Sequence, residues 1–249
     1  MHKAPLSIVA ALDDEIRVLN SKIEIDSRVH VRPALFTCGR FSEKPVLIVR
    51  SGIGRAAMKS AASYLLRNYD TSCCLHVGYC GGADPNGEPG DLIIAQEVVD
   101  SATGDRFATS KTLVSKAEAL CRDRNLRART GSLVTTDRVV EMPHEKAFVG
   151  TQHGACAIDM ESADLARACK NGGVPFLVVR SVLDPLDASL PDMGDSVTEE
   201  GKTDGMALAE HMIRKPKDLL KLPHIQYLAS RARNSINSFL EAWIEREGI

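Results

Sequence analysis

Short apolar runs of strand length alternate along the chain with segments whose apolar residues recur at helical spacing. The strand-like runs lie at Leu6–Leu12, Pro45–Arg50, Cys73–Val77, Leu92–Val99, Ala128–Val134 and Pro175–Ser181. The helical pattern occurs at Arg55–Tyr69, at Leu113–Arg124 and in the stretch that follows Glu161. Alternation of this kind is typical of α/β proteins, so we expect a three-layer α/β/α fold.

The pattern changes toward the C-terminus. Residues Asp187–Gly205 are rich in Asp, Gly, Ser and Thr and predict a long loop, a type of segment that often covers a site. Helical periodicity resumes at Met206–Arg214 and Pro216–Ile244. The apolar side of the last helix fits docking on the sheet or at a subunit interface, and its basic flanks also fit contact with a membrane or a lipid-bearing substrate. We expect one domain over residues 1–249, with 187–249 forming the covering loop and the C-terminal helices.

The composition is that of an ordinary globular protein. The chain has 249 residues with 31 basic and 33 acidic side chains and a net charge of −2, so no polyanion-binding surface is indicated. The 7 cysteines form no CxxC pair and no ligand-like spacing with histidine, which favours buried reduced thiols over a metal site. No segment approaches the length of a membrane span, and the N-terminal apolar run is too short for a signal peptide. We therefore expect a cytoplasmic protein with no metal and no nucleic-acid partner.

Charged residues stand at both ends of a strand–helix–strand pattern over Ala157–Asp184. Asp159 and Glu161 precede the helix, and the strand after the helix delivers Arg180 and then Asp184 at its far end. Ligands of open α/β sheets gather where strands give way to loops. Carboxylates at two such positions suit a reaction that grips a polyol at one end and protonates a leaving group at the other.

Several blocks, in the same order along the chain, resemble the nucleoside phosphorylase/nucleosidase superfamily. They are LSIVAALDDE from Leu6, Ser51-Gly52-Ile53-Gly54, His76 to Ala83, Gly90-Asp91 and the Ala157–Asp184 stretch. The best-known nucleosidase branch of this superfamily cleaves 5′-methylthioadenosine and S-adenosylhomocysteine. The resemblance implies a central mixed twisted sheet and a homo-oligomer, either a dimer or a trimer. It also implies an enzyme without a cofactor that cleaves the N-glycosidic bond of a purine nucleoside or a 5′-modified adenosine.

The resemblance further implies roles for individual residues. Asp184 matches the acid that protonates N7 of a purine, and Glu15 matches the carboxylate that activates water. Glu161 matches the residue that binds the ribose 2′- and 3′-hydroxyls. The remaining predicted substrate-binding residues are Met160 beneath the sugar, Arg180 near the water and the ribose, and Asp159, Gly81, Tyr79 and Val140.

Each of these assignments has a structural alternative. Asp184 precedes a proline, and Asp-Pro is a common turn opener. Glu161 also fits a carboxylate favoured at the start of a helix, and Glu15 fits a solvated acidic turn. Gly81-Gly82 fits a tight turn, and the methionine beside Glu161 fits core packing. A buried Arg180 would need a partner, for which Glu15 and Glu161 are the candidates.

Departures from the superfamily pattern bear on the nucleophile. Phosphorolytic members usually carry an Arg just before the Gly of the strand-end loop and a Ser just after it, where this chain has His76 and Tyr79. An Arg binds phosphate far better than a His that is mostly neutral at pH 7, and Glu15 would repel phosphate while serving as a base for water. We therefore expect hydrolysis. The alternatives are phosphorolysis with Arg55 and Arg180 as anion ligands, and a catalytically silent nucleoside-binding protein on the same fold.

Two further features concern the substrate. In the block Thr135–Val140, valines stand where a base-stacking Phe is common, so bond type is predicted more directly than base preference. Short pieces toward the C-terminus resemble the hopanoid-associated phosphorylase branch, namely Asp184-Pro185, Ser189-Leu190-Pro191, Thr203-Asp204-Gly205, Arg214-Lys215-Pro216 and Leu222-Pro223. That branch has been linked to the removal of adenine from an adenosylated hopane lipid. The resemblance implies adenosylhopane as a candidate substrate and peripheral membrane or lipid contact through the C-terminal helix.

Overall fold

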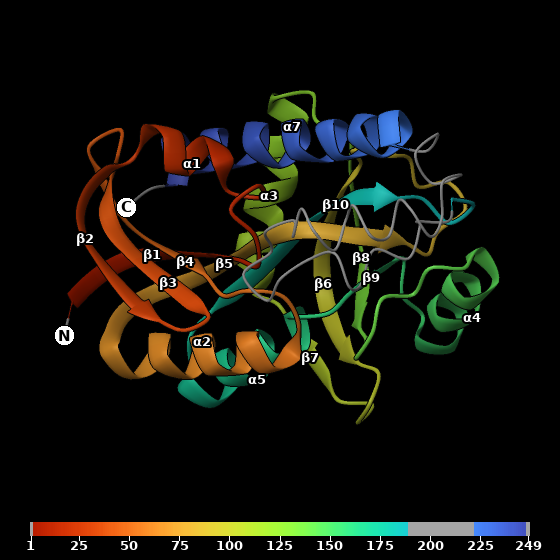
Figure 1. The fold of residues 1–249 in the computed structure, drawn as a ribbon, viewed down its shortest axis with the longest axis horizontal. Helices are drawn as coiled ribbons and strands as arrows, with labels where there is room; N and C mark the ends of the chain where they lie inside the picture. Colours follow the sequence, from red (N-terminus) through yellow and green to blue (C-terminus); the bar gives the residue numbers. More distant parts are fainter. Residues whose placement is uncertain (1, 189–221, 248–249) are drawn as a thin grey trace, which may run out of the picture.

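A central β-sheet separates two groups of helices in the computed structural model, which describes residues 2–188 and 222–247 (Figure 1). The strands are β1 (His2–Ala10), β2 (Glu24–Val31), β3 (Ala34–Phe41), β4 (Lys44–Arg50), β5 (Tyr69–Gly82), β6 (Leu92–Asp100), β7 (Arg106–Ala108), β8 (Ala128–Thr135), β9 (Ala157–Asp159) and β10 (Phe176–Asp184). The helices are α1 (Arg17–Lys22), α2 (Arg55–Asn68), α3 (Lys111–Asp123), α4 (Pro143–His153), α5 (Ser162–Gly172) and α7 (Leu222–Glu247). The predicted three-layer α/β/α sandwich with a mixed sheet is confirmed.

Parts of the predicted C-terminal region lie outside the described residues. These are the loop Asp187–Gly205 beyond Ala188, the helix Met206–Arg214 and the start of the helix Pro216–Ile244.

The sheet closes on itself at one end. Its strand order is β10-β6-β8-β9-β5-β1-β4-β3-β2, with β7 beside β6, and β10 also pairs with β5. Strand β10 runs parallel to β5 and antiparallel to β6, while β9 runs antiparallel to β5 and parallel to β8. These pairings form a closed circuit of strands. As a result, residues at the ends of β5, β8, β9 and β10 are brought around one place.

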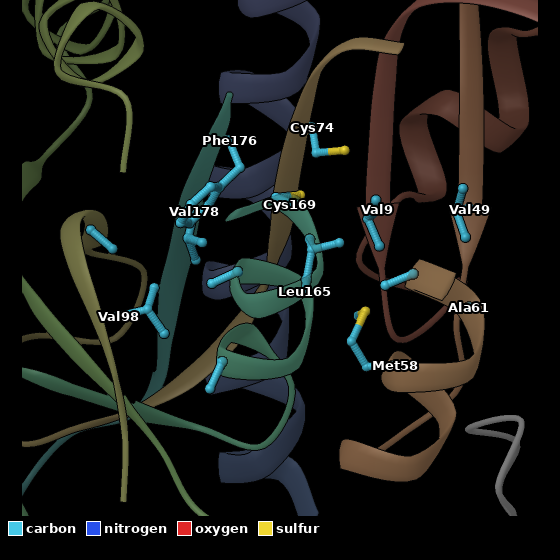
Figure 2. Packing of buried hydrophobic residues seen from close by; sticks show 14 of the residues in the cluster. Val9, Val49, Met58, Ala61, Cys74, Val98, Leu165, Cys169, Phe176 and Val178 are labelled. Carbon is cyan, nitrogen blue, oxygen red and sulfur yellow. The ribbon is translucent and has the colours of Figure 1, made fainter. Parts of the chain in front are cut away.

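The two faces of the sheet hold separate apolar cores. Because successive side chains of a strand point to opposite faces, Ile8 and Val9 of β1 belong to different cores. Helices α2 and α5 cover the face of Val9, and α1, α3 and α7 cover the face of Ile8 (Figure 1). Figure 2 shows the first core, where α2 and α5 meet the strands through Val9, Val49, Met58, Ala61, Cys74, Val98, Leu165, Cys169, Phe176 and Val178.

Helix α7 closes the second core. Its side chains Ile236, Phe239, Leu240 and Trp243 are buried, and the rings of Phe239 and Trp243 stack at 5.5 Å between centroids. Helix α7 thus docks on the sheet, as the sequence analysis expects. The apolar side chains of this face are used in the core, and contact of the basic flanks of the helix with lipid stays a prediction. Of the helices in residues 2–188 and 222–247, none combines the length and the apolar character needed to cross a membrane.

The structure also differs from the predicted elements in the centre of the sheet. Strand β5 runs from Tyr69 to Gly82, well beyond the predicted Cys73–Val77, because its pairing with β10 continues to Gly81 and β9 pairs with Gly81 and Gly82. The two glycines are therefore strand residues, and the tight-turn alternative is wrong.

Helix α4 and the hairpin of β2 and β3 were not predicted. In the outer strand β2 the side chains are exposed or half-buried, so it has no apolar run of the kind that indicates the inner strands.

Replacing Trp243 by Ala should lower the free energy of unfolding by about 3–5 kcal/mol, because this side chain is 2% exposed and fills the second core. Urea unfolding followed by circular dichroism would measure the change. The control is Tyr227→Ala on the same helix, where the side chain is 53% exposed and we expect a change within about 0.5 kcal/mol. Equal changes in the two variants would contradict the packing of α7 described above.

Candidate active site

A cavity lies where β1, β5, β8, β9 and β10 end, and it collects residues that are far apart in the sequence. All the predicted site residues except Arg180 line it, namely Glu15, Tyr79, Gly81, Val140, Asp159, Met160, Glu161 and Asp184. Much of the remaining lining is apolar, including Leu12, Ile53, Val139, Ile158 and Leu183. A largely apolar wall with a few converging polar groups is typical of a small-molecule site.

Arg180 lies behind the cavity wall with a fully buried guanidinium group. Its Nη2 atom lies 2.5 Å from Asp159 Oδ2 and 3.9 Å from Glu161 Oε2. The sequence indicated Glu15 or Glu161 as the partner of this arginine. Glu161 is a partner at the longer distance, and the structure adds Asp159, because β9 ends at this residue and brings its carboxylate into direct contact with the guanidinium.

The carboxylate of Asp159 is engaged on all sides by protein groups. The hydroxyl of Thr135 donates to Oδ1 at 2.7 Å, and the hydroxyl of Ser162 donates to Oδ2 at 2.5 Å. Arg180 binds the same Oδ2 atom. Asp159 therefore lines the cavity, but its carboxylate is bound to neighbouring protein groups and holds Arg180 in place.

Glu15 is 3% exposed, so the alternative of a solvated acidic turn is wrong. The backbone N–H groups of Ala11 and Leu12 donate to its Oε2 atom, each at 2.9 Å, and the N–H of Tyr79 donates to Oε1 at 2.9 Å. Burial raises the pKa of Glu15, against the opposing influence of Arg180 and these hydrogen bonds. A carboxylate with a raised pKa is a stronger base than an exposed one, which suits proton abstraction.

The backbone at Gly78 passes directly against Glu15 and Arg180. A Cβ atom at this position would lie 2.6 Å from Glu15 Oε1 and closer still to the Arg180 guanidinium. Only a residue without a side chain fits between them, so this glycine allows both charged groups to meet β5.

Glu161 stands immediately before α5 but makes no side-chain hydrogen bond that caps that helix. Its Oε1 atom instead accepts a hydrogen bond from the N–H of Gly54 at 2.7 Å. Burial raises the pKa of Glu161 to about 7, with the charge of Asp159 adding to the rise and Arg180 opposing it. The carboxylate is directed by a distant segment rather than by its own helix, as expected for a group that serves a site.

Asp184 ends β10 opposite Gly81 of β5 and is 4% exposed. A Cβ atom at Gly81 would lie 3.6 Å from both carboxylate oxygens, so the chain is close but not crowded there. Burial raises the pKa of Asp184 to about 6, and the ammonium group of Lys146 opposes this rise. A carboxyl group that titrates near neutral pH is suited to act as a general acid.

Lys146 forms an ion pair with Asp184 and was not predicted from the sequence. It lies on α4 and is fully buried. No sequence pattern distinguishes this lysine from a surface lysine, because the surrounding helix is largely polar. Only the packing of α4 against the end of β10 shows where it points.

Glu15 and Asp184 occupy different places along β5. Glu15 contacts the backbone at Tyr79, and Asp184 lies against Gly81. Tyr79 and Gly81 lie two residues apart on the extended strand β5, so the two carboxyl groups meet this strand at points about 7 Å apart. Carboxyl groups at separate places on the wall of one cavity can act as an acid on one side of a reacting carbon and as a base on the other.

The ring of Tyr79 lines the cavity and is linked to the C-terminal helix. Its hydroxyl donates to Asp14 Oδ2 at 2.7 Å, and Arg233 of α7 lies 3.1 Å from Asp14 Oδ1. This network fixes one wall of the cavity. No group of three or more His, Cys, Asp or Glu side chains that would hold a metal ion occurs among the residues that the structure describes.

The sequence profile of the Phosphorylase superfamily matches residues 5–214. A 5′-methylthioadenosine/S-adenosylhomocysteine nucleosidase of Geobacillus kaustophilus is 29% identical over 195 residues, which cover 72% of this chain and 83% of that protein. The same enzyme of Neisseria meningitidis, solved with methylthio-immucillin-A, superposes with a TM-score of 0.73 at 19% identity, covering 97% and 99% of the two chains. Futalosine hydrolase of Helicobacter pylori gives a TM-score of 0.71 at 18% identity, covering 96% and 97%.

The chain belongs to the phosphorylase superfamily. It is an enzyme of the class that contains nucleosidases and nucleoside phosphorylases, which confirms the class predicted from the sequence. The roles of the individual site residues stay predictions.

Arg180→Met should destabilise the protein by about 3–5 kcal/mol near neutral pH, because buried carboxylates would lose their cation. The loss should be smaller at about pH 5 than at about pH 8. Without Arg180 the pKa of Glu161 in the folded protein rises further above its value in the unfolded chain. At low pH Glu161 is then protonated and needs no cation, so the variant loses less stability there. As the pH rises through this pKa, Glu161 becomes an unpaired buried charge and the free energy of unfolding falls.

Urea unfolding at the two pH values would measure this difference. Arg106→Met is the matched control, since Arg106 is half exposed and pairs with Glu97 at the surface. We expect a change within about 1 kcal/mol for it at both pH values. A pH-independent loss in the Arg180 variant would contradict the electrostatic account.

Proposed function

We propose that this enzyme hydrolyses the N-glycosidic bond of a purine nucleoside, with a 5′-modified adenosine as the preferred class of substrate. Its relatives include nucleosidases and a futalosine hydrolase, which supports hydrolysis of nucleoside N-glycosidic bonds in general. The observation that carries the proposal is the pair of buried carboxyl groups, Glu15 and Asp184, which line one cavity and meet β5 at Tyr79 and at Gly81.

The reaction divides the work between the two carboxyl groups. Protonated Asp184 gives its proton to N7 of the base while the bond between C1′ and N9 breaks and its electron pair leaves with the base. The sugar passes through an oxocarbenium-like state. Ionised Glu15 takes a proton from water as the water oxygen bonds to C1′, and free base and free sugar are the products.

Glu161 and Met160 are proposed to hold the ribose between these groups. Oε1 of Glu161 accepts from Gly54, and Oε2, which lies 3.9 Å from Arg180 Nη2, is the oxygen that we expect to accept hydroxyl hydrogen bonds. Met160 is adjacent in the chain and lines the same cavity, where it offers an apolar surface to the sugar. A carboxylate that accepts two hydroxyls distinguishes a ribonucleoside from a deoxyribonucleoside.

Water is favoured over phosphate because the nearby cations are already paired with carboxylates. Arg55 binds Asp100 at 2.6 Å and Asp164 at 2.8 Å, and Arg180 binds Asp159 at 2.5 Å. Burial and the charge of Arg180 lower the pKa of the His76 imidazole, which is therefore neutral and a poor phosphate ligand. A phosphate dianion would have to displace a carboxylate to gain a cationic partner.

The finer substrate assignment rests on the cavity wall. Leu12, Ile53, Val139 and Val140 offer apolar surface to a purine ring and to an apolar group on the 5′ carbon. The pieces from Ser189 to Pro216 that resemble the hopanoid-associated branch lie outside the described residues. Adenosylhopane as substrate, peripheral lipid contact, the homo-oligomeric state and the cytoplasmic location stay predictions.

The central test is the release of base without phosphate. The protein should release adenine from 5′-modified adenosines in phosphate-free buffer, with a free 5′-modified ribose as the second product, both identified by chromatography. Glu15→Gln should lower the turnover number by about a hundredfold or more, because the base that activates water is lost. Formation of a ribose 1-phosphate that depends strictly on added phosphate would restore phosphorolysis, and binding without turnover would indicate a silent nucleoside-binding protein.

Glu161→Gln should impair ribonucleosides far more than 2′-deoxynucleosides. Each charge-assisted hydrogen bond to a hydroxyl contributes about 1.5–3 kcal/mol, so kcat/KM for the ribonucleoside should fall at least about tenfold more than for the deoxynucleoside. Parallel assays with adenosine and 2′-deoxyadenosine would measure the ratio. Equal losses on both sugars would show that Glu161 does not contact the 2′-hydroxyl.

A further inference from the structure

Lys146 is a fully buried lysine whose ammonium group is surrounded by three acceptors. Its Nζ atom is ion-paired with Asp184 Oδ2, and it donates to the backbone oxygens of Pro185 at 3.1 Å and Ala188 at 2.8 Å. An ammonium group has three donors, so all of them are used. The whole arrangement is directed at one carboxyl group and at the turn that follows it.

This burial is costly and is not explained by packing alone. Removing an ammonium group from water costs several kcal/mol, and an apolar side chain of similar length would fill the same space without that cost. Lys146 comes from α4, which otherwise presents half-buried and exposed side chains apart from Gly150. A buried charge at this position therefore points to a role at Asp184.

We propose that Lys146 is a positioning residue for the general acid, and that it stabilises the carboxylate left on Asp184 when the proton passes to the departing base. The inference rests on the proposed function and concerns how the protonation of its general acid, Asp184, is controlled. Before the transfer Asp184 is neutral, and Lys146 interacts with a dipole. After the transfer Lys146 faces a full negative charge, so the interaction strengthens as the bond breaks.

Lys146 also sets the balance between holding and releasing the proton. Burial alone would make Asp184 retain its proton too firmly, and the adjacent cation opposes this, leaving a pKa of about 6. Among the described residues, the neighbours that bear on this carboxyl are Lys146 of α4 and the thiol of Cys80 on β5. Burial raises the pKa of Cys80, so the thiol stays neutral and Lys146 supplies the charge that acts on Asp184.

The two backbone contacts supply the positioning. Pro185 and Ala188 follow Asp184 directly, and their carbonyl oxygens are held by the same ammonium group that binds the carboxylate. The end of β10 and the turn after it are thereby fixed relative to α4. An acid must be held within hydrogen-bond reach of the base nitrogen, so this clamp serves the transfer as well as the fold.

The test compares the pH dependence of kcat/KM in the wild type, Lys146→Met and Lys146→Gln. Activity requires protonated Asp184, so it is present below the pKa of that group and is lost as the pH rises through it. Removal of the cation raises this pKa, so the alkaline limb should move to higher pH in both neutral variants. The turnover number at the optimum should fall roughly tenfold or more, because the carboxylate formed in the transition state loses its stabilisation.

Two further measurements separate this role from a purely structural one. Lys146→Arg keeps the charge, so its alkaline limb should stay at the wild-type position. In an Asp184→Asn background, removal of Lys146 should change the turnover number by less than about twofold, because no carboxylate forms. Lys59→Met on the exposed side of α2 is the matched lysine control and should match the wild type.

The outcomes are distinct. If the wild type releases no base from any nucleoside, the proposed function itself fails. If the wild type is active but a folded neutral variant keeps the wild-type alkaline limb, only the role of Lys146 is overturned. Failure of both neutral variants to fold, judged by circular dichroism, would assign Lys146 to the fold alone and would also overturn the proposal.

Discussion

The buried positive charge of Arg180 is the constraint on which the site depends. A guanidinium removed from water must be neutralised nearby, and Asp159 supplies the direct partner while Glu161 lies at 3.9 Å. The close passage of β5 beside it requires Gly78, where a side chain would collide with Arg180 and Glu15. One buried cation thus requires a glycine on the neighbouring strand and holds two carboxylates near it.

The opposite end of the cavity is governed by a different cation. Asp184 sits against Lys146, while Glu15 is held mainly by backbone N–H groups. Placing chemically similar carboxyl groups in unlike surroundings is how proteins separate an acid from a base. In this chain the separation follows from topology, since Glu15 comes after β1 and Asp184 ends β10 on the other side of β5.

The sequence predicted the parts of the site that lie at strand ends. Glu15, Glu161 and Asp184 follow or end apolar runs, so their convergence could be inferred from the usual placement of ligands in α/β folds. The pairing of Arg180 with Asp159 could not, because it depends on the short strand β9 meeting the end of β10. Lys146 was missed for the same kind of reason, since its burial is a property of tertiary packing and leaves no periodic signal.

The strands show the same contrast between what an apolar pattern predicts and what depends on tertiary packing. Inner strands such as β6 are mostly apolar and were predicted with nearly correct limits. The outer hairpin of β2 and β3 was missed because β2 has no buried side chain to produce an apolar pattern. The length of β5 was underestimated because its last residues include two glycines, which are kept extended by β9 and β10.

The position of α7 after all the strands in the sequence has a consequence for folding during synthesis. Every strand precedes this helix, yet α7 supplies the Phe239, Leu240 and Trp243 side chains that cover one face of the sheet. During synthesis on the ribosome the part of that face that α7 covers stays open to water, and to other nascent chains, until the helix has emerged. The second core is therefore completed only after α7 has been synthesised, when all the strands that this helix covers have already been made.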